Sequence, residues 1–354
     1  MKSKKTVHRH LTIDGVKVKP GSNAVINIEI PGLYTGTKMT MPVRVFHGKD
    51  TGPCLFVCAA IHGDEINGVE ILRRLHGLKL LSKLHGTLIT VPVVNVYGFN
   101  NQSRYLPDRR DLNRSFPGAA TGSLASRLAY IFMREIAARA THGIDLHTAA
   151  IHRDNFPHVR ACLDNRKVGD MARAFPVPVI LDSKPVEGSM RKALYDSGVP
   201  VILYEAGEAL RFNEFAIRTG VQGIVAVMRK LDMLPDKNVT DKVIQPVIAT
   251  SSTWVRATRS GVLRNFTALG SVVKKNQSMG VITDPAGRKD KIISAPISGL
   301  VIGRSNVPLV QEGEALFHIA HLNKTTGIKK VIDMFQQSIN SDADRIFSDE
   351  KPLI

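Results

Sequence analysis

The amino-acid sequence predicts an α/β fold, a mixed sheet flanked by helices, followed by a smaller all-β domain. Two observations support this prediction. Up to about residue 235, continuous apolar runs alternate with segments of helical periodicity, the pattern of a sheet covered by helices. After residue 235 the chain loses helical periodicity, and regularly placed glycines separate short apolar segments rich in Val and Ile, which is typical of an all-β unit.

The first strands are expected between residues 11 and 49, as short strands joined by turns. Residues 24–30 alternate partly between apolar and polar side chains, the period of a half-buried strand. Residues 54–61 form an uninterrupted apolar run, which indicates a strand buried on both faces. Residues 87–94 form the next apolar run, and a polar loop extends from there to residue 118.

A helix is predicted to begin near Glu65, because Val69, Leu72 and Leu75 recur close to helical spacing. Residues 123–140 predict a second helix. Three further apolar runs predict strands at 143–147, 177–181 and 199–204.

The chain divides into three predicted parts. Leu234-Pro235-Asp236-Lys237-Asn238 has the composition of a linker, and the Gly-rich segment follows from Thr253 to Ala320. Residues after 325 have the composition of a polar tail or a terminal helix. We therefore predict an α/β domain at residues 1–237, a β domain at 238–325 and a tail at 326–354.

The composition favours an anionic partner. Lys and Arg number 48 against 31 Asp and Glu, so the formal net charge is +17, which attracts carboxylates and other anions. Aromatic residues are only 6%, and no nucleic-acid-binding signature is present, so we expect no nucleic-acid partner. No apolar run is long enough for a membrane span or a signal peptide, and the three cysteines form no disulfide framework. We expect a cytoplasmic protein, with its oligomeric state open and a homo-oligomer included.

Two histidines and a glutamate follow predicted strands and are candidate metal ligands. His62 and Glu65 lie on one turn after the 54–61 run, and His147 ends the 143–147 run. Imidazole and carboxylate groups are the ligands that zinc prefers, and a catalytic zinc takes three protein ligands. An isolated His-x-x-Glu pair is a weak signal, since a glutamate is favourable at a helix N-terminus in any case.

A strongly basic loop is the candidate anion-binding element. Asp111-Leu112-Asn113-Arg114 closes it, and Arg104, Arg109 and Arg110 precede that motif. An arginine can grip a carboxylate with two parallel hydrogen bonds, and the neighbouring Asn adds a donor. For any single arginine, a solvated basic loop is the simpler explanation.

Glu205 is the candidate general base. It follows the 199–204 run in Tyr204-Glu205-Ala206-Gly207-Glu208, and a carboxylate at a strand end can accept a proton from a nucleophilic water. We assign no role to Glu208. Since ligands of open α/β sheets bind at the carboxyl ends of strands, His62, His147 and Glu205 are expected to converge.

The ordered motifs His-Gly-Asp-Glu, Asp-Leu-Asn-Arg, Asp-Leu-His-Thr and Glu-Ala-Gly resemble the succinylglutamate desuccinylase/aspartoacylase family, which is related to the zinc carboxypeptidases. The resemblance covers roughly residues 40–320. It implies a zinc carboxypeptidase-like sheet with one zinc ion per chain, on His62, Glu65 and His147. The resemblance also implies roles for other residues. Asn113 and Arg114 would hold the substrate carboxylate, and Glu205 would be the base. Arg104 would polarise the scissile carbonyl, with Arg109 and Arg110 as alternatives in the same loop.

Two further regions carry the resemblance. Asn155-Phe156-Pro157 with Arg160 is similar to a subfamily feature near the substrate, so Arg160 joins Arg110 as a candidate substrate-binding residue. The segments 260–263 and 295–301 resemble a biotinyl/lipoyl-like barrel-sandwich domain. Its carrier function is not implied, because the chain has no Ala-Met-Lys-Met sequence.

The predicted activity is hydrolysis of an amide bond in a small, anionic N-acyl amino acid. One alternative is a metallocarboxypeptidase that removes acidic C-terminal residues with the same metal and base. Another is a metal-free binding protein that kept the fold. Loss of a ligand or of the base would mark the latter, and every role in the expected site is filled.

Overall fold

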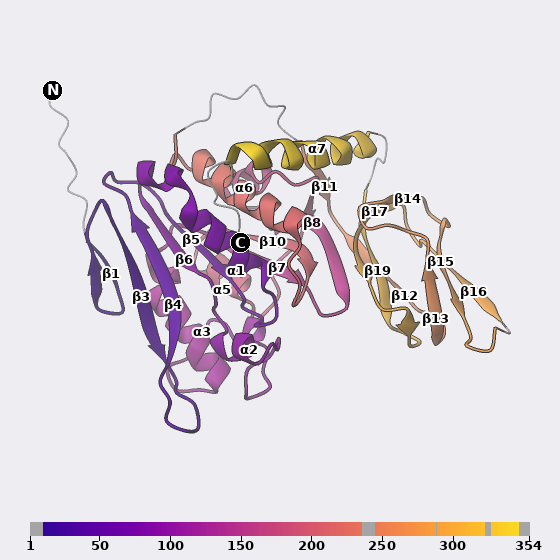
Figure 1. Ribbon diagram of the computed structural model, residues 1–354, viewed down its shortest axis with the longest axis horizontal. Helices are drawn as coiled ribbons and strands as arrows, with labels where there is room; N and C mark the ends of the chain where they lie inside the picture. The colour runs from indigo at the N-terminus through magenta and orange to yellow at the C-terminus, as the bar shows by residue number, and fades with distance from the viewer. Residues whose placement is uncertain (1–9, 236–244, 288, 323–326, 347–354) are drawn as a thin grey trace.

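A large mixed sheet forms the body of the protein, and helices pack on both of its faces (Figure 1). The computed structural model describes residues 10–235, 245–287, 289–322 and 327–346. Within them, 13 strands join in one sheet, whose central order is β12-β19-β17-β8-β10-β7-β5-β6-β4-β3. The predicted α/β class with a large mixed sheet is confirmed. No helix in the described ranges combines the length and apolar character that crossing a membrane requires.

The strands before residue 235 are β1 (Leu11–Ile13), β2 (Val16–Val18), β3 (Ser22–Ile30), β4 (Met39–His47), β5 (Cys54–Ala59), β6 (Thr87–Val91), β7 (His142–Ala149), β8 (Arg153–Ala161), β9 (Val179–Asp182) and β10 (Val201–Glu208). The helices in this part are α1 (Asn67–Gly77), α2 (Val96–Asn100), α3 (Leu124–Glu135), α4 (Arg166–Ala174), α5 (Met190–Asp196) and α6 (Glu214–Lys230), with short 3₁₀ turns at Lys79–Lys83, Leu112–Arg114 and Ala137–Arg139.

Strand β5 supplies apolar side chains to two separate cores. Leu55, Val57 and Ala59 face the core that α1, α4 and α6 cover. Phe56 and Cys58 face the opposite core, which α3 and α5 cover. Because successive side chains of a strand point to opposite faces, a strand between two helical layers must be apolar throughout. This explains the unbroken apolar run from residue 54.

The parallel strands β5, β7 and β10 bring the predicted motifs to one edge of the sheet. Cys58 of β5 is in register with Asp145 of β7, and His147 of β7 is in register with Glu205 of β10. The turn that carries His62 follows β5 directly. The predicted convergence at the carboxyl ends of the strands is therefore observed, and it depends on these registers.

Two elements differ from the sequence-based expectation. The segment 22–47 forms one long hairpin of nine-residue strands, β3 and β4, instead of several short strands. Strand β8, which we did not predict, lies antiparallel to β10 inside the sheet. Pro157 interrupts its pattern, but the strand tolerates it because neither Phe156 nor Pro157 has a registered partner. Before this point β8 pairs with β17, and after it β8 pairs with β9.

The C-terminal strands are antiparallel to one another, apart from β11, which pairs in parallel with β9. They are β11 (Val247–Ala249), β12 (Ser252–Arg256), β13 (Gly261–Asn265), β14 (Val272–Val273), β15 (Ser278–Thr283), β16 (Asp290–Ser294), β17 (Gly299–Ser305), β18 (Leu309–Val310) and β19 (Ala315–His321). We refer to the strands β12–β19 as the C-terminal β unit. The unit does not stand apart, since its strand β17 pairs with β8 and so extends the main sheet.

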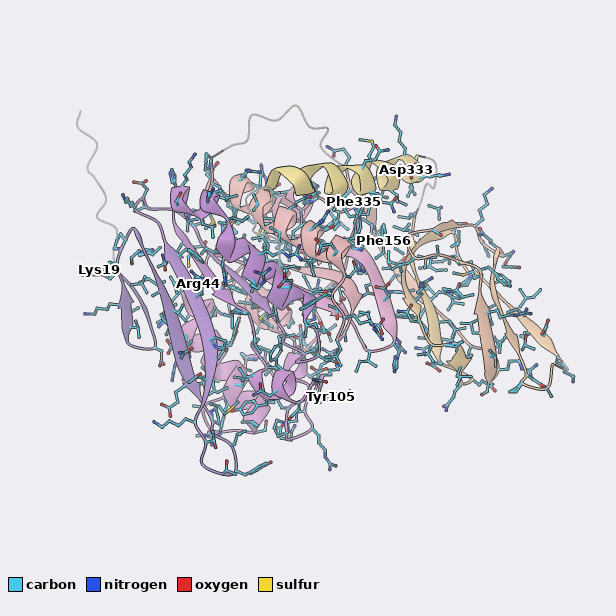
Figure 2. The ribbon with its side chains drawn as sticks, in the orientation of Figure 1. Lys19, Arg44, Tyr105, Phe156, Asp333 and Phe335 are labelled. Atoms are coloured by element: carbon cyan, nitrogen blue, oxygen red, sulfur yellow. The ribbon has the colours of Figure 1, made fainter. Side chains whose placement is uncertain are left out.

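The chain after the β unit returns to the main sheet. Helix α7 (Ile328–Ile346) runs beside α6, and its Phe335 ring lies 6.0 Å from that of Phe156 on β8 (Figures 1 and 2). Of the two expectations for this segment, the helix is the one observed. The predicted domain boundaries at 237/238 and 325/326, and most of the predicted linker 234–238, lie outside the described residues, so this division stays a prediction.

Candidate active site

His62, Glu65 and His147 converge at the carboxyl edge of the sheet. His62 and Glu65 lie on the turn between β5 and α1, which begins two residues after Glu65, and His147 lies near the end of β7. Gly63 allows the turn to pack tightly, since a Cβ atom there would come within 2.0 Å of the Gly98 backbone. All three candidate ligands are buried.

The three side chains place their ligand atoms within 4.8 Å of one another. The Glu65 carboxylate lies between the two imidazoles, with Oε1 2.6 Å from His62 Nδ1 and Oε2 2.9 Å from His147 Nδ1. The backbone N–H of Thr148 also donates to Glu65 Oε2. Two nitrogens and a carboxylate in this arrangement can hold a divalent metal ion.

The charges of this cluster depend on one another. Burial alone would raise the pKa of Glu65, but the two imidazolium groups beside it hold that pKa well below its usual range. Burial would likewise lower the pKa of His147, but the carboxylates of Asp145 and Glu65 raise it well above its usual value. The carboxylates and the imidazoles therefore stabilise each other's charged forms. A metal ion would bind the neutral imidazoles, so metal binding would compete with their protonation.

Two further carboxylates lie beside the second nitrogens of the histidines, and sequence analysis assigned them no role. Asp145 Oδ2 lies 2.8 Å from His147 Nε2, which leaves Nδ1 of that ring facing the ligand cluster. Asp111 Oδ1 lies 3.3 Å from His62 Nε2. Metal-binding histidines commonly hydrogen-bond a carboxylate through their second nitrogen, as His147 does, whereas His62 Nε2 has no hydrogen-bond partner among the described residues. Both aspartates could have been identified from the sequence, because each is the first residue of a motif that also contains a candidate site residue.

The basic loop contributes Arg104, Asn113 and Arg114 to the pocket lining. Arg104 Nη2 donates to Asp111 Oδ2 at 2.9 Å, and Nη1 lies 3.5 Å from Glu65 Oε1. The backbone N–H of Met190 donates to Asn113 Oδ1, which fixes this side chain against the start of α5. Arg110 is not among the lining residues, and its Nε lies 3.9 Å from Asp108 Oδ2 on the exposed side of the loop.

Glu205 lines the same pocket from β10, and β8 holds both of its carboxylate oxygens. Asn155 Nδ2 donates to Oε2 at 2.8 Å, and Arg160 Nε lies 3.4 Å from Oε1. Glu208, three residues on, accepts hydrogen bonds from the His152 backbone and from Asn306. The structure therefore places Glu205 and Arg160 in the pocket, while Glu208 has structural partners.

Arg191 is a pocket residue that sequence analysis missed. It comes from α5 and is 7% exposed. Its Nη2 donates to Ser183 Oγ and to the Lys184 carbonyl, while Nη1 is buried with no hydrogen-bond partner among the described residues. Burial and the neighbouring Arg160 lower the pKa of Arg191. An unsatisfied buried guanidinium N–H is costly, so this group favours an anionic ligand in the pocket. No motif in the sequence marked this residue.

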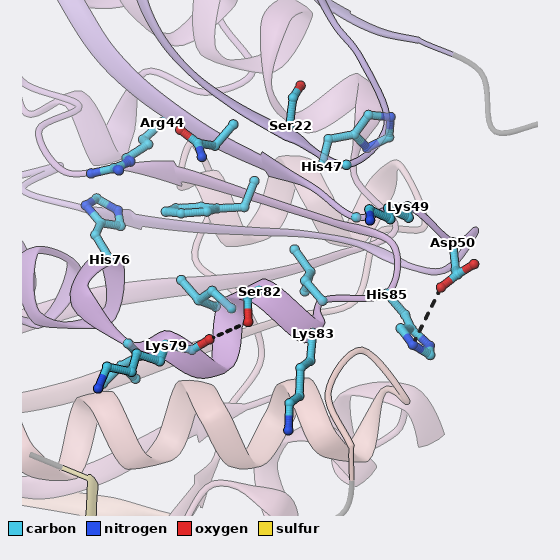
Figure 3. Close-up of a pocket in the computed structure, with 17 residues that line it drawn as sticks. Ser22, Arg44, His47, Lys49, Asp50, His76, Lys79, Ser82, Lys83 and His85 are labelled. Atoms are coloured by element: carbon cyan, nitrogen blue, oxygen red, sulfur yellow. Dashed lines mark hydrogen bonds and ion pairs between the residues drawn. The ribbon is translucent and has the colours of Figure 1, made fainter. Parts of the chain in front are cut away.

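Two cavities of the protein differ in size and in the groups that line them. The pocket at the His-Glu-His cluster has a volume of about 180 Å³ and contains Arg104, Arg114, Arg160 and Arg191 against Glu65 and Glu205. A larger cavity of about 550 Å³ lies at the opposite edge of the sheet, where Figure 3 shows Arg44, His76, Lys79 and Lys83 around it. Within the described part of the chain, the first pocket holds the one group with metal-ligand geometry, so we identify it as the candidate active site.

The chain is similar to known proteins both in sequence and in fold. The model of the succinylglutamate desuccinylase/aspartoacylase catalytic domain matches residues 51–231, just over half of the chain. N-alpha-acetyl-L-2,4-diaminobutyric acid deacetylase of Halomonas elongata is 25% identical over 304 residues, which are 81% of this chain and 87% of that protein.

Solved structures share the fold. The product-bound ectoine utilization protein EutE (DoeB) from Ruegeria pomeroyi aligns with a TM-score of 0.76 at 23% identity, over 84% of this chain and 95% of that one. A succinylglutamate desuccinylase/aspartoacylase from Rhodobacter sphaeroides aligns with a TM-score of 0.76 at 21% identity, over 86% of this chain and 96% of that one.

Proposed function

The chain belongs to the succinylglutamate desuccinylase/aspartoacylase family, and from that premise we propose that it is a zinc-dependent hydrolase. The proposed substrate is a small N-acyl amino acid, whose amide bond is cleaved to a carboxylate and an amine. One observation carries the proposal: a buried His-Glu-His ligand set, a glutamate and four arginines converge in one small pocket.

The donor set fits zinc. Two imidazole nitrogens and one carboxylate are the ligand types that catalytic zinc takes, and three protein ligands leave a position for solvent and substrate. His62, Glu65 and His147 would hold the ion, and Asp145 would keep His147 in the tautomer that presents Nδ1 to it. Zinc in such a site makes water a stronger nucleophile near neutral pH and acts as a Lewis acid.

Glu205 is the proposed general base. Its carboxylate lines the pocket beside the ligand cluster, and Asn155 and Arg160 hold it in one orientation. In the proposed reaction the Glu205 carboxylate accepts the proton of the attacking water and later donates it to the nitrogen of the leaving amine. The amide carbon–nitrogen bond breaks in that second step.

The arginines are proposed to orient the substrate and to stabilise developing charge. Arg104, which Asp111 holds against the ligand cluster, would donate to the oxygen of the scissile carbonyl. Asn113 and Arg114 would bind the substrate carboxylate. Arg160 and Arg191, which also line the pocket, would complete its cationic environment for the anionic substrate. Arg110 has no role in this proposal, because it lies outside the pocket lining.

The size of the pocket supports a small substrate. A volume of about 180 Å³ is below the roughly 300–1,000 Å³ of sites for drug-sized ligands. The Halomonas elongata relative is named as a deacetylase of an N-acetyl amino acid. Both observations favour a deacylase over a carboxypeptidase that binds an extended peptide.

The proposal is tested by a substrate screen. Zinc-loaded protein is incubated with N-acetyl, N-succinyl and N-formyl amino acids, including N-acetyl-L-2,4-diaminobutyrate, and in parallel with peptides that end in Asp or Glu. We expect amine release from at least one N-acyl amino acid, abolished by a chelator and restored by zinc. Release from the peptides alone would favour the carboxypeptidase. No release from either set, with zinc bound, would contradict the hydrolase assignment.

A further inference from the structure

The Glu205 carboxylate is positioned from strand β8. Asn155 Nδ2 lies 2.8 Å from Oε2, and Asn155 is itself only 8% exposed. An ionised carboxylate can only accept hydrogen bonds, so the amide nitrogen of Asn155, and not its oxygen, must face Glu205. The carbonyl oxygen of the same amide then points away from the pocket.

That oxygen points toward the C-terminal β unit. Asn155 is in register with Gly207 of β10 on one side and with Gly303 of β17 on the other. A Cβ atom at position 303 would lie 2.9 Å from Asn155 Oδ1 and 3.2 Å from His318 Cβ. The Asn155 amide therefore occupies space that is open only because residue 303 has no side chain.

A second contact joins the β unit to the same stretch of β10. Asn306, just after β17, donates from Nδ2 to Glu208 Oε2 at 2.9 Å, and its backbone N–H donates to the His152 carbonyl at 2.8 Å. The backbone N–H of His152 in turn donates to Glu208 Oε1. The segment from Glu205 to Glu208 is thus linked to the β unit at two points, through Asn155 of β8 and through Asn306, and β8 lies between β10 and β17 in the sheet (Figure 1).

From these contacts we propose that Asn155 is a positioning residue for the Glu205 base and that Gly303 of the C-terminal β unit sets the orientation of Asn155. The inference rests on the proposed function, because it takes Glu205 as the base. It gives the β unit a role in the active site, since β17 supplies the surface against which the Asn155 amide is oriented.

Gly303→Ala tests the proposal with little expected harm to the fold. The new methyl group would meet the end of a flexible side chain at Asn155 and would need a shift of a few tenths of an ångström at His318. We expect the Asn155 amide to turn away from Glu205. Loss of an outer hydrogen-bond partner of a metal ligand typically costs about 10- to 100-fold in activity, and we expect a loss of the same order for this partner of the base. With N-acetyl-L-2,4-diaminobutyrate as substrate, the loss should fall on kcat, while KM and zinc content stay near wild type.

A double-mutant cycle separates positioning from general disturbance. Asn155→Ala should lower kcat by a similar factor. Asn155→Ala with Gly303→Ala should be no worse than Asn155→Ala alone, because the proposal has the methyl group affect Glu205 only through the Asn155 amide. Gly169→Ala is the matched control. Like the Cβ atom at position 303, a Cβ atom there would come closest to the end of a side chain, Arg173 Nη1 at 2.8 Å on helix α4. Its kcat should equal that of wild type.

Losses in the double variant that equal the product of the single losses would overturn the proposal, and so would a wild-type kcat in Gly303→Ala. One readout needs no activity at all. Crystal structures of zinc-loaded wild type and Gly303→Ala should differ in the Asn155–Glu205 hydrogen bond, which we expect to be broken in the variant. If the bond persists there, the proposal is wrong whatever the enzyme hydrolyses. If Glu205→Gln has normal turnover, the assignment of the base fails instead.

Discussion

His147 Nε2 lies 2.8 Å from Oδ2 of Asp145, whose side chain is almost wholly buried two residues away on the same strand. The pair directs the other ring nitrogen, Nδ1, toward Glu65. A carboxylate behind a metal-binding imidazole fixes the tautomer and the orientation of the ring, so Asp145 should contribute to metal affinity without touching the metal.

Asp145→Asn should weaken zinc binding by about 10- to 100-fold, the usual cost of losing such a partner. The measurement is competition with a chromophoric chelator. His62→Ala and His147→Ala serve as reference variants and should lose zinc almost completely, while His85→Ala, an exposed histidine far from the ligand cluster, should bind zinc as wild type does. A zinc content equal to that of wild type in both reference variants would contradict the ligand assignment.

Glu205→Gln should keep zinc bound and lower turnover by about 10²- to 10⁴-fold, because glutamine keeps the size of the side chain and removes its basicity. Glu208→Gln is the matched comparison. Its partners are the His152 backbone and Asn306, and it does not line the pocket, so turnover should change little. Steady-state kinetics and metal analysis on both variants check this. A larger loss of turnover in Glu208→Gln than in Glu205→Gln would indicate that Glu208 is the base.

Arg114→Lys should reduce kcat/KM on a carboxylate substrate, because an ammonium group lacks the planar fork of a guanidinium. Arg114 is exposed, so we expect a loss near the value for a hydrogen bond to a charged group, about 1.5–3 kcal/mol. That is roughly 10- to 150-fold at 1.36 kcal/mol per tenfold. The loss should largely vanish on a substrate whose carboxylate is replaced by a neutral amide. Equal losses on both substrates would show that Arg114 does not bind the carboxylate.

Arg191→Lys should cost more than Arg114→Lys, because Arg191 is buried and its Nη1 has no hydrogen-bond partner among the described residues. Truncating one member of a buried charged contact costs about 2–5 kcal/mol, so we expect roughly a 30- to several-thousand-fold loss of kcat/KM. Thermal unfolding of the variant tests for a folding defect. A stable variant with unchanged kcat/KM would exclude Arg191 from substrate binding.

The protein should lose stability in mild acid because of the depressed pKa of His318. Burial lowers its pKa to about 3, helped by the Arg160 cation, and burial also lowers the pKa of the neighbouring His158. A depressed folded pKa means that the unfolded chain gains a proton below about pH 6.5 while the folded protein does not. The contribution of His318 to the free energy of unfolding is therefore fully present above that pH and is lost as the pH falls toward 3.

The size of the effect follows from linkage. Between pH 7.5 and 5, one such histidine removes about 2 kcal/mol from the free energy of unfolding. His318→Gln keeps a polar group near Ser252 and removes the titration, so urea unfolding should show a smaller loss over this range than in wild type. A variant with the same pH dependence as wild type would show that His318 is not responsible.

The sequence by itself determined the features that depend on local order. The apolar run from residue 54 predicted a strand buried on both faces, because a strand between two helical layers can hold few polar side chains. His62, His147 and Glu205 each follow or end such a run, so their convergence could be expected from the rule that ligands bind at the carboxyl ends of strands. The family was evident from the order of the motifs and is confirmed.

Tertiary structure alone decided which neighbours these residues have. Arg104 and Arg110 belong to one basic loop, and only the folded loop shows that Arg104 turns toward Glu65 while Arg110 turns toward Asp108. Arg191 enters the pocket from a helix whose sequence carries no motif.

Strand β8 was hidden by Pro157, and the pairing of Asn155 with Gly303 joins residues far apart along the chain. The physical reason is common to these cases. Periodicity and turn chemistry report the forces between residues close in sequence, whereas strand register and side-chain contacts depend on packing across the whole sheet.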